Sequence, residues 1–410
     1  MRRLFTVVNR REHETAAREG RGMATTTMPA WIGAPPTRLQ ATAILYVGIT
    51  AVMIAGLQPL LLGALQAEGR LTAAQLGHAA TAELLTMGVT ASIAGAWLKP
   101  KALRWVGLGA GLLLAVIDAL TPKGSGEGVT LIRAAAGAPS GVMLWMTIGL
   151  ITRAPRPERW SGVFLTLQTL AQFGLSAALT AWVIGKTGAD GGFLALAAMS
   201  ALAGVAALVG PAAFAPLGHT DAPAGLPSPR GAAALAACFL FLACIVGVWV
   251  YAEPLSHQSG HPPAVAGTAI SLSLAFQVLG GTAATLLAGR LRWFWVLLGC
   301  TAVDLALLAI FAALPGAAVF LAVSAAFGFI WLFLMPFLVP MTIQADPTRR
   351  SAILLGGAQL LGGSLGPLMA STLVTDSDAR GALAFGAGCL LVAMAIVAAL
   401  HMRPAREVAV

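Results

Sequence analysis

Charge is scarce along this chain of 410 residues. Asp, Glu, Lys and Arg make up only 10% of it, while 58% of its residues are hydrophobic and its mean hydropathy is +0.83. Soluble domains carry about 25% charged residues, because a surface that faces water needs them. So little charge excludes a soluble globular protein. It predicts an all-α polytopic membrane protein whose surface faces mainly lipid.

Patterns for metal binding, disulfides or catalysis are also lacking. The four cysteines lie within apolar runs and none has CxxC spacing, so neither a metal site nor a disulfide framework is indicated. There is no HExxH motif and no Asp-rich pair that could bind a diphosphate with magnesium. We therefore expect no cofactor and no enzymatic activity. We expect no nucleic-acid partner despite the net charge of +9, because the basic residues of membrane proteins collect on their cytoplasmic loops.

What the chain does have is a series of long apolar runs. About 20 apolar residues cross the hydrocarbon core as a helix, and the breaks between runs are charged or rich in Pro and Gly. This pattern predicts twelve transmembrane helices. Their approximate limits are 40–65, 73–98, 103–120, 129–152, 161–186, 191–214, 231–255, 264–288, 293–314, 316–343, 351–374 and 380–402.

Basic residues are divided unevenly between the two sets of loops that twelve spans create. Twenty of the 25 Lys and Arg residues fall on the side that also carries both termini, and four fall on the other. Both termini are therefore predicted to be cytoplasmic, in a multi-pass protein of the inner (plasma) membrane. Residues 1–38 are predicted to form a disordered cytoplasmic tail, with Met23 as an alternative start, and 403–410 a second tail.

The chain divides into two similar halves. Residues 215–230, rich in Pro and Gly, are predicted to be a cytoplasmic linker between a bundle of six helices at 39–214 and another at 231–402. The run "LRWVGLG" in the first half matches "LRWFWVLLG" in the second, and Asp118 has a rough counterpart in Asp304. Two pseudo-symmetric bundles with a site between them are typical of transporters that open alternately to each side.

Two motifs resemble those of the major facilitator superfamily. "LIRAAAGAPSG", with Arg133 and Gly137, is similar to the Arg-x-x-x-Gly signature of the fourth helix, which is associated with coupling in proton-driven members. "GGSLGPL", at 362–368, is similar to the Gly-Pro-rich signature of antiporters, although it lies in the eleventh helix rather than the fifth. The resemblance implies two six-helix bundles and a secondary transporter.

An arginine within a membrane helix needs a compensating partner or a function. Arg133 lies in the outer third of the fourth predicted helix, at about the depth of Glu83 and Gln58 in the first two. These three side chains are predicted to share a pocket in which Glu83 binds and releases the coupling proton. Two alternatives remain: Arg133 binds an anionic substrate directly, or Glu83 and Arg133 only neutralise each other.

Polar and small residues mark other helix faces. Gln168, Gln172 and Ser176 recur every four residues and share one helix face, which meets either the substrate or a neighbouring helix. Gln277 and Gln359 are the comparable groups of the second half, and with Gln58, Gln168 and Gln172 they complete the predicted substrate cavity. Small residues let membrane helices approach closely, and proline favours bends. The predicted packing and hinge residues are Gly137, Gly141, Gly362, Gly363, Gly366 and Pro367.

Other ionisable residues are assigned structural positions. Asp304 is expected to bond to a neighbouring helix. Tyr251, Glu253 and His257 cluster at the outer end of the seventh predicted helix, where they form either an external gate or part of the membrane–water interface. The interface is favoured, since aromatic and charged residues gather there.

Together these features predict a secondary active transporter that moves a small organic solute by alternating access, coupled to protons. The scarcity of paired charges slightly favours export of a hydrophobic or amphipathic compound. Proton-coupled uptake of an aromatic acid, which Arg133 would suit, and a non-transporting sensor or scaffold are the alternatives. The expected partners are a small-molecule substrate, protons and the lipid bilayer, and the expected state is a monomer.

Overall fold

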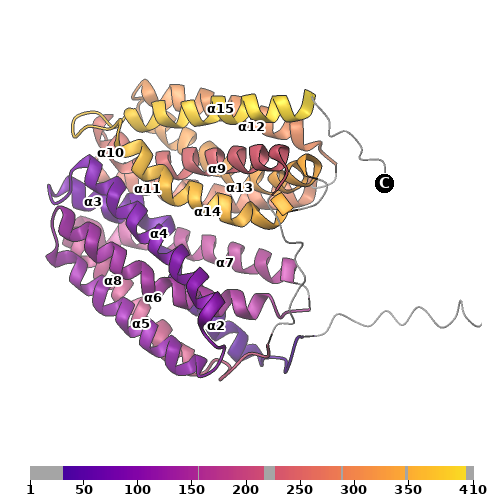
Figure 1. The fold of residues 1–410 in the computed structure, drawn as a ribbon. Helices are drawn as coiled ribbons and strands as arrows, with labels where there is room; N and C mark the ends of the chain where they lie inside the picture. Colours follow the sequence, from indigo (N-terminus) through magenta and orange to yellow (C-terminus); the bar gives the residue numbers. More distant parts are fainter. Residues whose placement is uncertain (1–30, 156, 217–226, 288–289, 347–349, 403–410) are drawn as a thin grey trace, which may run out of the picture.

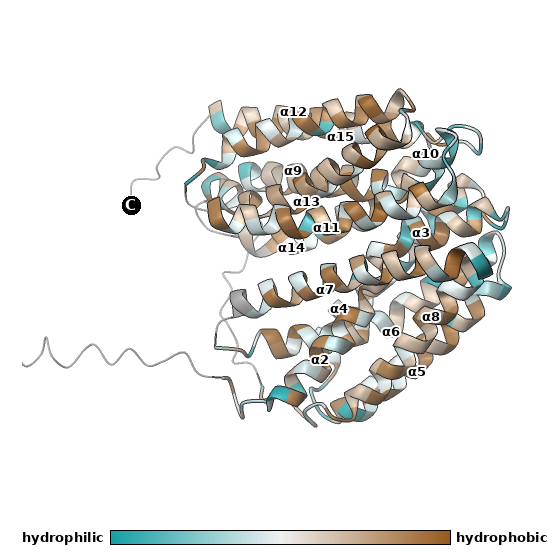
Figure 2. Ribbon diagram, turned by 180° about the vertical axis from the view of Figure 1, so that it is seen from behind, coloured by the Kyte–Doolittle hydropathy of each residue, from teal (hydrophilic) through white to brown (hydrophobic). Residues whose placement is uncertain are grey.

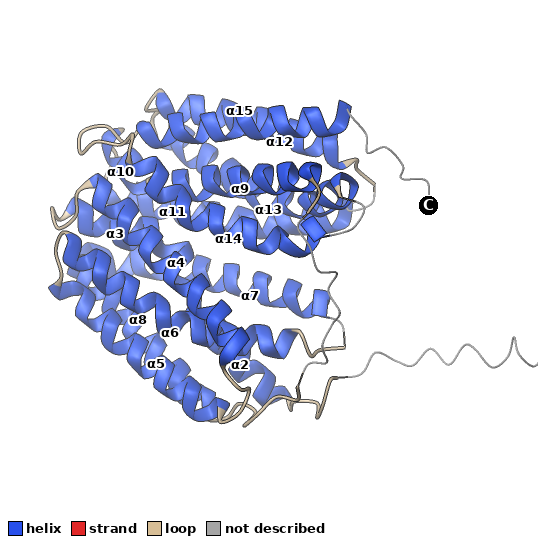
Figure 3. Ribbon diagram, viewed as in Figure 1, coloured by secondary structure: helices blue, strands red, loops and turns tan. Residues whose placement is uncertain are grey.

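A computed structural model describes residues 31–155, 157–216, 227–287, 290–346 and 350–402, and these parts of the chain are almost entirely helical (Figure 3). The α-helices are α2 (Arg38–Ala51), α3 (Met53–Ala67), α4 (Ala73–Trp97), α5 (Leu103–Leu120), α6 (Glu127–Ile151), α7 (Pro157–Ala178), α8 (Gly185–Ala207), α9 (Pro229–Trp249), α10 (Ala252–Gln258), α11 (Pro263–Leu287), α12 (Trp293–Ala312), α13 (Ala317–Ala345), α14 (Arg350–Ser371) and α15 (Gly381–Met402). A 3-10 turn, η1 (Thr121–Lys123), follows α5, and a π-helical turn, η2 (Leu179–Ile184), joins α7 to α8. Most of both predicted tails and of the predicted linker lies outside these ranges.

Nine stretches of the described residues are helical, long and apolar enough to cross a membrane. One of them, 160–207, runs through α7, η2 and α8 for 48 residues, which is enough for two crossings. Apolar residues line the lengths of the helices and polar ones gather at their ends (Figure 2). The prediction of a helical, multi-pass membrane protein is thus confirmed, while the count of twelve spans stays a prediction.

The helices pack in two groups. In the first, α4 lies along α6, α5 along α8, and α2 against both α6 and α8. In the second, α9 lies along α14 and α15, α11 along α13, and α12 against α13 and α15. Figure 1 shows the first group below and the second above, with the start of α2 and the end of α15 at the same end of the molecule. We call this the termini end, and the opposite one the far end.

Two predicted helices are interrupted. The run predicted at 40–65 breaks at Val52, whose carbonyl accepts a hydrogen bond from Gln172 Nε2 at 2.9 Å. A side chain inserted into the backbone ladder is a known cause of a kink. The run predicted at 231–255 ends at Trp249, and α10 follows. Pro254 has no N–H for the Val250 carbonyl and its ring crowds that carbonyl, which favours a break there.

Glycines allow the closest helix contacts. Gly137 and Gly141 of α6 lie against the backbone of α4, at the carbonyls of Glu83 and Met87. On α14, Gly362 and Gly366 meet the α9 carbonyls of Phe239 and Ala243 in the same way. Gly363 is different, because an added Cβ there would make only an ordinary contact with Val246.

Replacing Gly137 with Ala is expected to lower the free energy of unfolding by about 1–3 kcal/mol, the usual cost of overpacking. The new Cβ would collide with the backbone carbonyl of Glu83, which cannot move without separating α4 from α6. Thermal unfolding in detergent micelles measures the loss. Gly88→Ala on α4 is the matched control, because nothing lies within 4 Å of its added Cβ. That variant should be neutral or slightly more stable, since Ala is the better helix former.

Candidate functional site

Arg133 of α6 lies at the centre of a buried ionic cluster inside the first group of helices. Only 1% of its side chain is exposed. Its Nε donates to Glu83 Oε2 of α4 at 3.0 Å, and its Nη2 donates to the other oxygen of the same carboxylate. Its Nη1 donates to Asp118 Oδ1 of α5 at 2.8 Å and to Thr121 Oγ1 at 3.2 Å. The guanidinium carbon lies 5.3 Å from the centre of the Phe193 ring of α8, within cation–π range.

The cluster contains two acids for one base. Glu83 engages Arg133 through both oxygens, the strongest geometry for this pair. Asp118 uses one oxygen for Arg133, and its Oδ2 lies 3.0 Å from the hydroxyl of Ser200 on α8. With both carboxyls ionised, these buried groups would carry a net charge of −1, which is costly away from water. One bound proton makes the cluster neutral.

The structure brings together some of the predicted residues. Glu83 and Arg133 meet, as predicted, whereas the amide of Gln58 donates to the backbone carbonyl of Ala80 at 3.2 Å. Asp118, which the sequence pairs only with Asp304 of the second half, belongs to the cluster as well. The one available signal was a carboxyl within an apolar run.

The face of α7 that carries Gln168, Gln172 and Ser176 contacts neighbouring helices. Gln172 binds Val52 at the break between α2 and α3, and the Ser176 hydroxyl lies 2.9 Å from that of Ser271 on α11. Gln168 is half-buried. Gln172 and Ser176 therefore bond to neighbouring helices, which is one of the two alternatives for this helix face.

The second group of helices lacks a comparable cluster among its described residues. Asp304 of α12 is buried, but its Oδ1 has no hydrogen-bond partner there, so the expected bond from this atom to a neighbour is not found. Nε2 of Gln277 is likewise buried without a partner. The Gln359 amide lies 4.0 Å from the sulfur of Met335. The charge pattern of the two halves therefore differs even where their sequences match.

Among the contacts between the two groups of helices is one that we call the seam, formed by α3 and α4 on one side and by α9, α10, α14 and the 372–380 loop on the other. Ala73 at the start of α4 is bonded twice: its carbonyl accepts from the Tyr251 hydroxyl at 3.1 Å, and its N–H donates to Asp376 Oδ1 at 2.7 Å. Deeper in, the indole N–H of Trp249 donates to the Ala55 carbonyl at 3.3 Å. The seam joins the groups near the far end.

The structure corrects the assignment of Tyr251 and Glu253 to the membrane–water interface. Tyr251 is fully buried between α10 and α4, and Glu253 is 7% exposed against α3. Only His257 of the three is exposed. A single helix over 231–255 is the sequence-based prediction, whereas the observed break between α9 and α10 places Tyr251 and Glu253 against α4 and α3.

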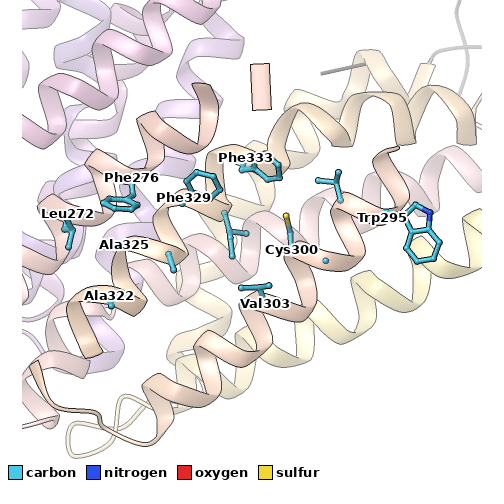
Figure 4. Close-up of a pocket in the computed structure, with 13 residues that line it drawn as sticks. Leu272, Phe276, Trp295, Cys300, Val303, Ala322, Ala325, Phe329 and Phe333 are labelled. Atoms are coloured by element: carbon cyan, nitrogen blue, oxygen red, sulfur yellow. The ribbon is translucent and has the colours of Figure 1, made fainter. Parts of the chain in front are cut away.

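A large apolar groove of about 780 Å³ lies in the second group of helices, between α11, α12 and α13 (Figure 4). Its walls include Phe276, Cys300 and Phe329, and its margin the exposed Trp295. None of the predicted site residues lines it. Its apolar, partly exposed walls match the surface that the helices present to lipid.

Comparison with known proteins gives a fold match. No family model matches the chain, and no curated protein matches it by sequence. The crystal structure of the nucleoside transporter NupG, a variant protein, superimposes with a TM-score of 0.70 at 13% identity, covering 88% of this chain and 99% of that one. A bacterial homologue of the human lysosomal transporter Spinster, in an inward-facing and occupied conformation, gives 0.56 at 12% identity, covering 89% and 93%.

Proposed function

Because the chain has the fold of the major facilitator superfamily, we propose that it is a proton-coupled secondary active transporter. It moves a small organic solute across the inner membrane by alternating access. The observation that carries the proposal is the buried cluster of Arg133, Glu83 and Asp118, in which two acids share one base. Buried ionisable groups at membrane depth mark proton and substrate pathways.

The proposal includes the topology. The basic bias of the loops assigns the termini end to the cytoplasm and the far end to the outside. Twelve spans then form two six-helix bundles at 39–214 and 231–402, and the protein acts as a monomer. In this orientation the seam is the external closure, so the state described is closed toward the outside.

Charge balance supports a proton as the coupling ion. The cluster is neutral with one proton bound and carries a charge of −1 without it. A conformational change that separates Asp118 from Arg133 or Ser200 changes the cost of that charge, and so the affinity for the proton. Glu83, held by both its oxygens, keeps Arg133 in place in this scheme.

The same geometry bears on the substrate. Four of the five N–H donors of Arg133 are taken up by Glu83, Asp118 and Thr121, so an anionic substrate would have to compete with two acids for this guanidinium. This favours export of a hydrophobic or amphipathic compound over uptake of an aromatic acid. Since one fold neighbour is a nucleoside transporter, nucleosides belong in the substrate screen alongside aromatic acids and lipophilic drugs.

The test uses the full chain in proteoliposomes with an imposed gradient of about one pH unit, which supports about tenfold accumulation per coupled proton. We expect the wild type to accumulate one compound class to that level. Asp118→Asn should reduce accumulation to equilibration, because its cluster is neutral without a proton. Glu127→Gln, which changes an exposed carboxyl, is the control and should behave as wild type.

Gradient-driven accumulation by Asp118→Asn at the wild-type level and with unchanged pH dependence would remove the proton role. Equal transport by wild type with and without the gradient would indicate a facilitator. Transport of none of the compound classes would favour a sensor or scaffold.

A further inference from the structure

A polar pocket of about 370 Å³ opens at the far end, on the seam. Gln66 of α3 lines one side, Glu253 and His257 of α10 line another, and the loop at 375–379 closes it. His257 and Asp376 are exposed there. This pocket is separate from the Arg133 cluster, which is enclosed by α4, α5, α6 and α8.

Gln66 Oε1 is buried in this pocket without a hydrogen-bond partner among the described residues, and Glu253 is the buried ionisable group there that lacks one. Its side chain is more than nine-tenths buried, and no hydrogen bond or ion pair reaches its carboxyl from the described residues. It packs directly on Gly63 of α3, where an added Cβ would lie 2.6 Å from the Glu253 Cβ. A carboxyl of the second group of helices is thus pressed against the backbone of the first.

The charged groups around the pocket are committed elsewhere. Asp376 accepts from the Ala73 N–H, and Asp378 is held by Arg380 and by Gln258. Glu68 and Arg70, just after α3, form an ion pair with each other. Glu68 also accepts a hydrogen bond from the Ala189 N–H, and Arg70 donates to the carboxylate of Asp190. His257, on the same helix as Glu253, is exposed, and α9, α11 and α14 bring no charged side chain to this level.

Burial raises the pKa of Glu253, and no hydrogen bond or positive charge from the described residues lowers it. The candidate membrane span of α9 ends at Trp249, and Glu253 lies outside the stretches that are long and apolar enough to cross a membrane. Burial against α3 raises the pKa of this carboxyl from its ordinary 4.5 to about 7. An ionised Glu253 would therefore be a buried charge without a partner, which proteins avoid by protonation or by exposure to water.

We propose that Glu253 is a second proton-binding site, reached from the outer solution through the pocket, and that its protonation allows the seam to close. The external placement of this site rests on the proposed transporter topology. When Glu253 loses its proton, the carboxylate draws water between α3 and α10 and the seam separates. Proton binding at the outer face would thereby be linked to closure on that face.

The direction of the pH effect follows from the two pKa values. An open seam would expose Glu253 to water and return it to a pKa of 4.5, whereas the closed seam holds it at about 7. Closure is then fully favoured below pH 4.5, weakens as the pH rises toward 7, and is least favoured above 7. The ratio of closed to open molecules changes by up to roughly 300-fold across this range.

The experiment measures the opening directly in the full chain, in lipid nanodiscs. Spin labels at Ser125→Cys and Ala264→Cys, both exposed at the far end on opposite sides of the seam, report their separation by pulsed spectroscopy. The four native cysteines are buried, and unsubstituted protein gives the labelling background. We expect a longer separation at about pH 9 than at about pH 5. In Glu253→Gln, the short separation should persist at every pH.

His257→Gln is the matched control and should keep the transition, since an exposed imidazole is not the sensor. Glu253→Asp, which retains a carboxyl, should keep a transition at a different pH, and covers the case in which the Gln variant fails to elute as a folded protein. An unchanged transition in Glu253→Gln, or no transition in the wild type, would overturn the inference. The readout needs no substrate, so it stands or fails independently of the transport assays.

Discussion

Replacing Arg133 with Met is expected to lower the free energy of unfolding by about 3–5 kcal/mol, the usual cost of removing one partner from a buried ion pair. The change leaves Glu83 and Asp118 buried without the guanidinium, and the four oxygen atoms that accept its hydrogen bonds lose their donors. Met replaces the arginine stem and keeps its apolar packing, so most of the loss reports the missing guanidinium. Unfolding in mixed SDS and mild-detergent micelles measures it.

Arg380→Met provides the control for this measurement. Arg380 also pairs with a carboxylate, that of Asp378 at 2.9 Å, but its side chain is 47% exposed. Exposed pairs of this kind contribute about 0–1 kcal/mol. If Arg133→Met were as mild as Arg380→Met, the buried carboxyls would have to be neutral already, and the guanidinium would not be what holds the cluster together.

The second large effect is expected when the whole cluster is removed. The triple variant Glu83→Leu, Asp118→Leu and Arg133→Met should recover most or all of the stability lost in Arg133→Met, because well-packed apolar replacements of buried ion networks are often neutral or stabilising by about 1–4 kcal/mol. The gradient-driven transport proposed above, however, should be abolished, since no group of the cluster remains to bind the coupling proton.

The triple variant separates a structural role from a coupling role, which single substitutions cannot do. Stability is measured in the same micelles, and transport in proteoliposomes with and without a pH gradient. Recovery of both stability and gradient-driven accumulation would show that the three side chains only neutralise one another. Recovery of stability with loss of accumulation assigns them to coupling.

The class of fold and one contact of the cluster could be predicted from the sequence. Apolar runs dictate helices in lipid, and an arginine at the depth of a glutamate in the same half invites pairing. Asp118 could not be placed beside Arg133, because residue counting gives a side chain's depth but not its direction around the helix. That direction is set by how α5 packs on α6 and α8.

The misplacement of Tyr251 and Glu253 has a different origin. Both lie near the end of an apolar run, where aromatic and charged residues usually contact headgroups. The helix breaks between Trp249 and Ala252, a few residues before Pro254. At the break Tyr251 contacts α4, and just after it Glu253 contacts α3. Pro254 was visible in the sequence, but which way the chain turns after a break depends on the tertiary contacts that receive it.

The bond from Trp249 to Ala55 has a consequence for motion. Pro59 supplies no N–H to the Ala55 carbonyl four residues earlier, and the indole of the opposite half fills that vacancy. Parting the halves would strip this oxygen of its donor in a region where lipid offers none. Hydration must therefore accompany separation, and dehydrating conditions should trap the molecule shut.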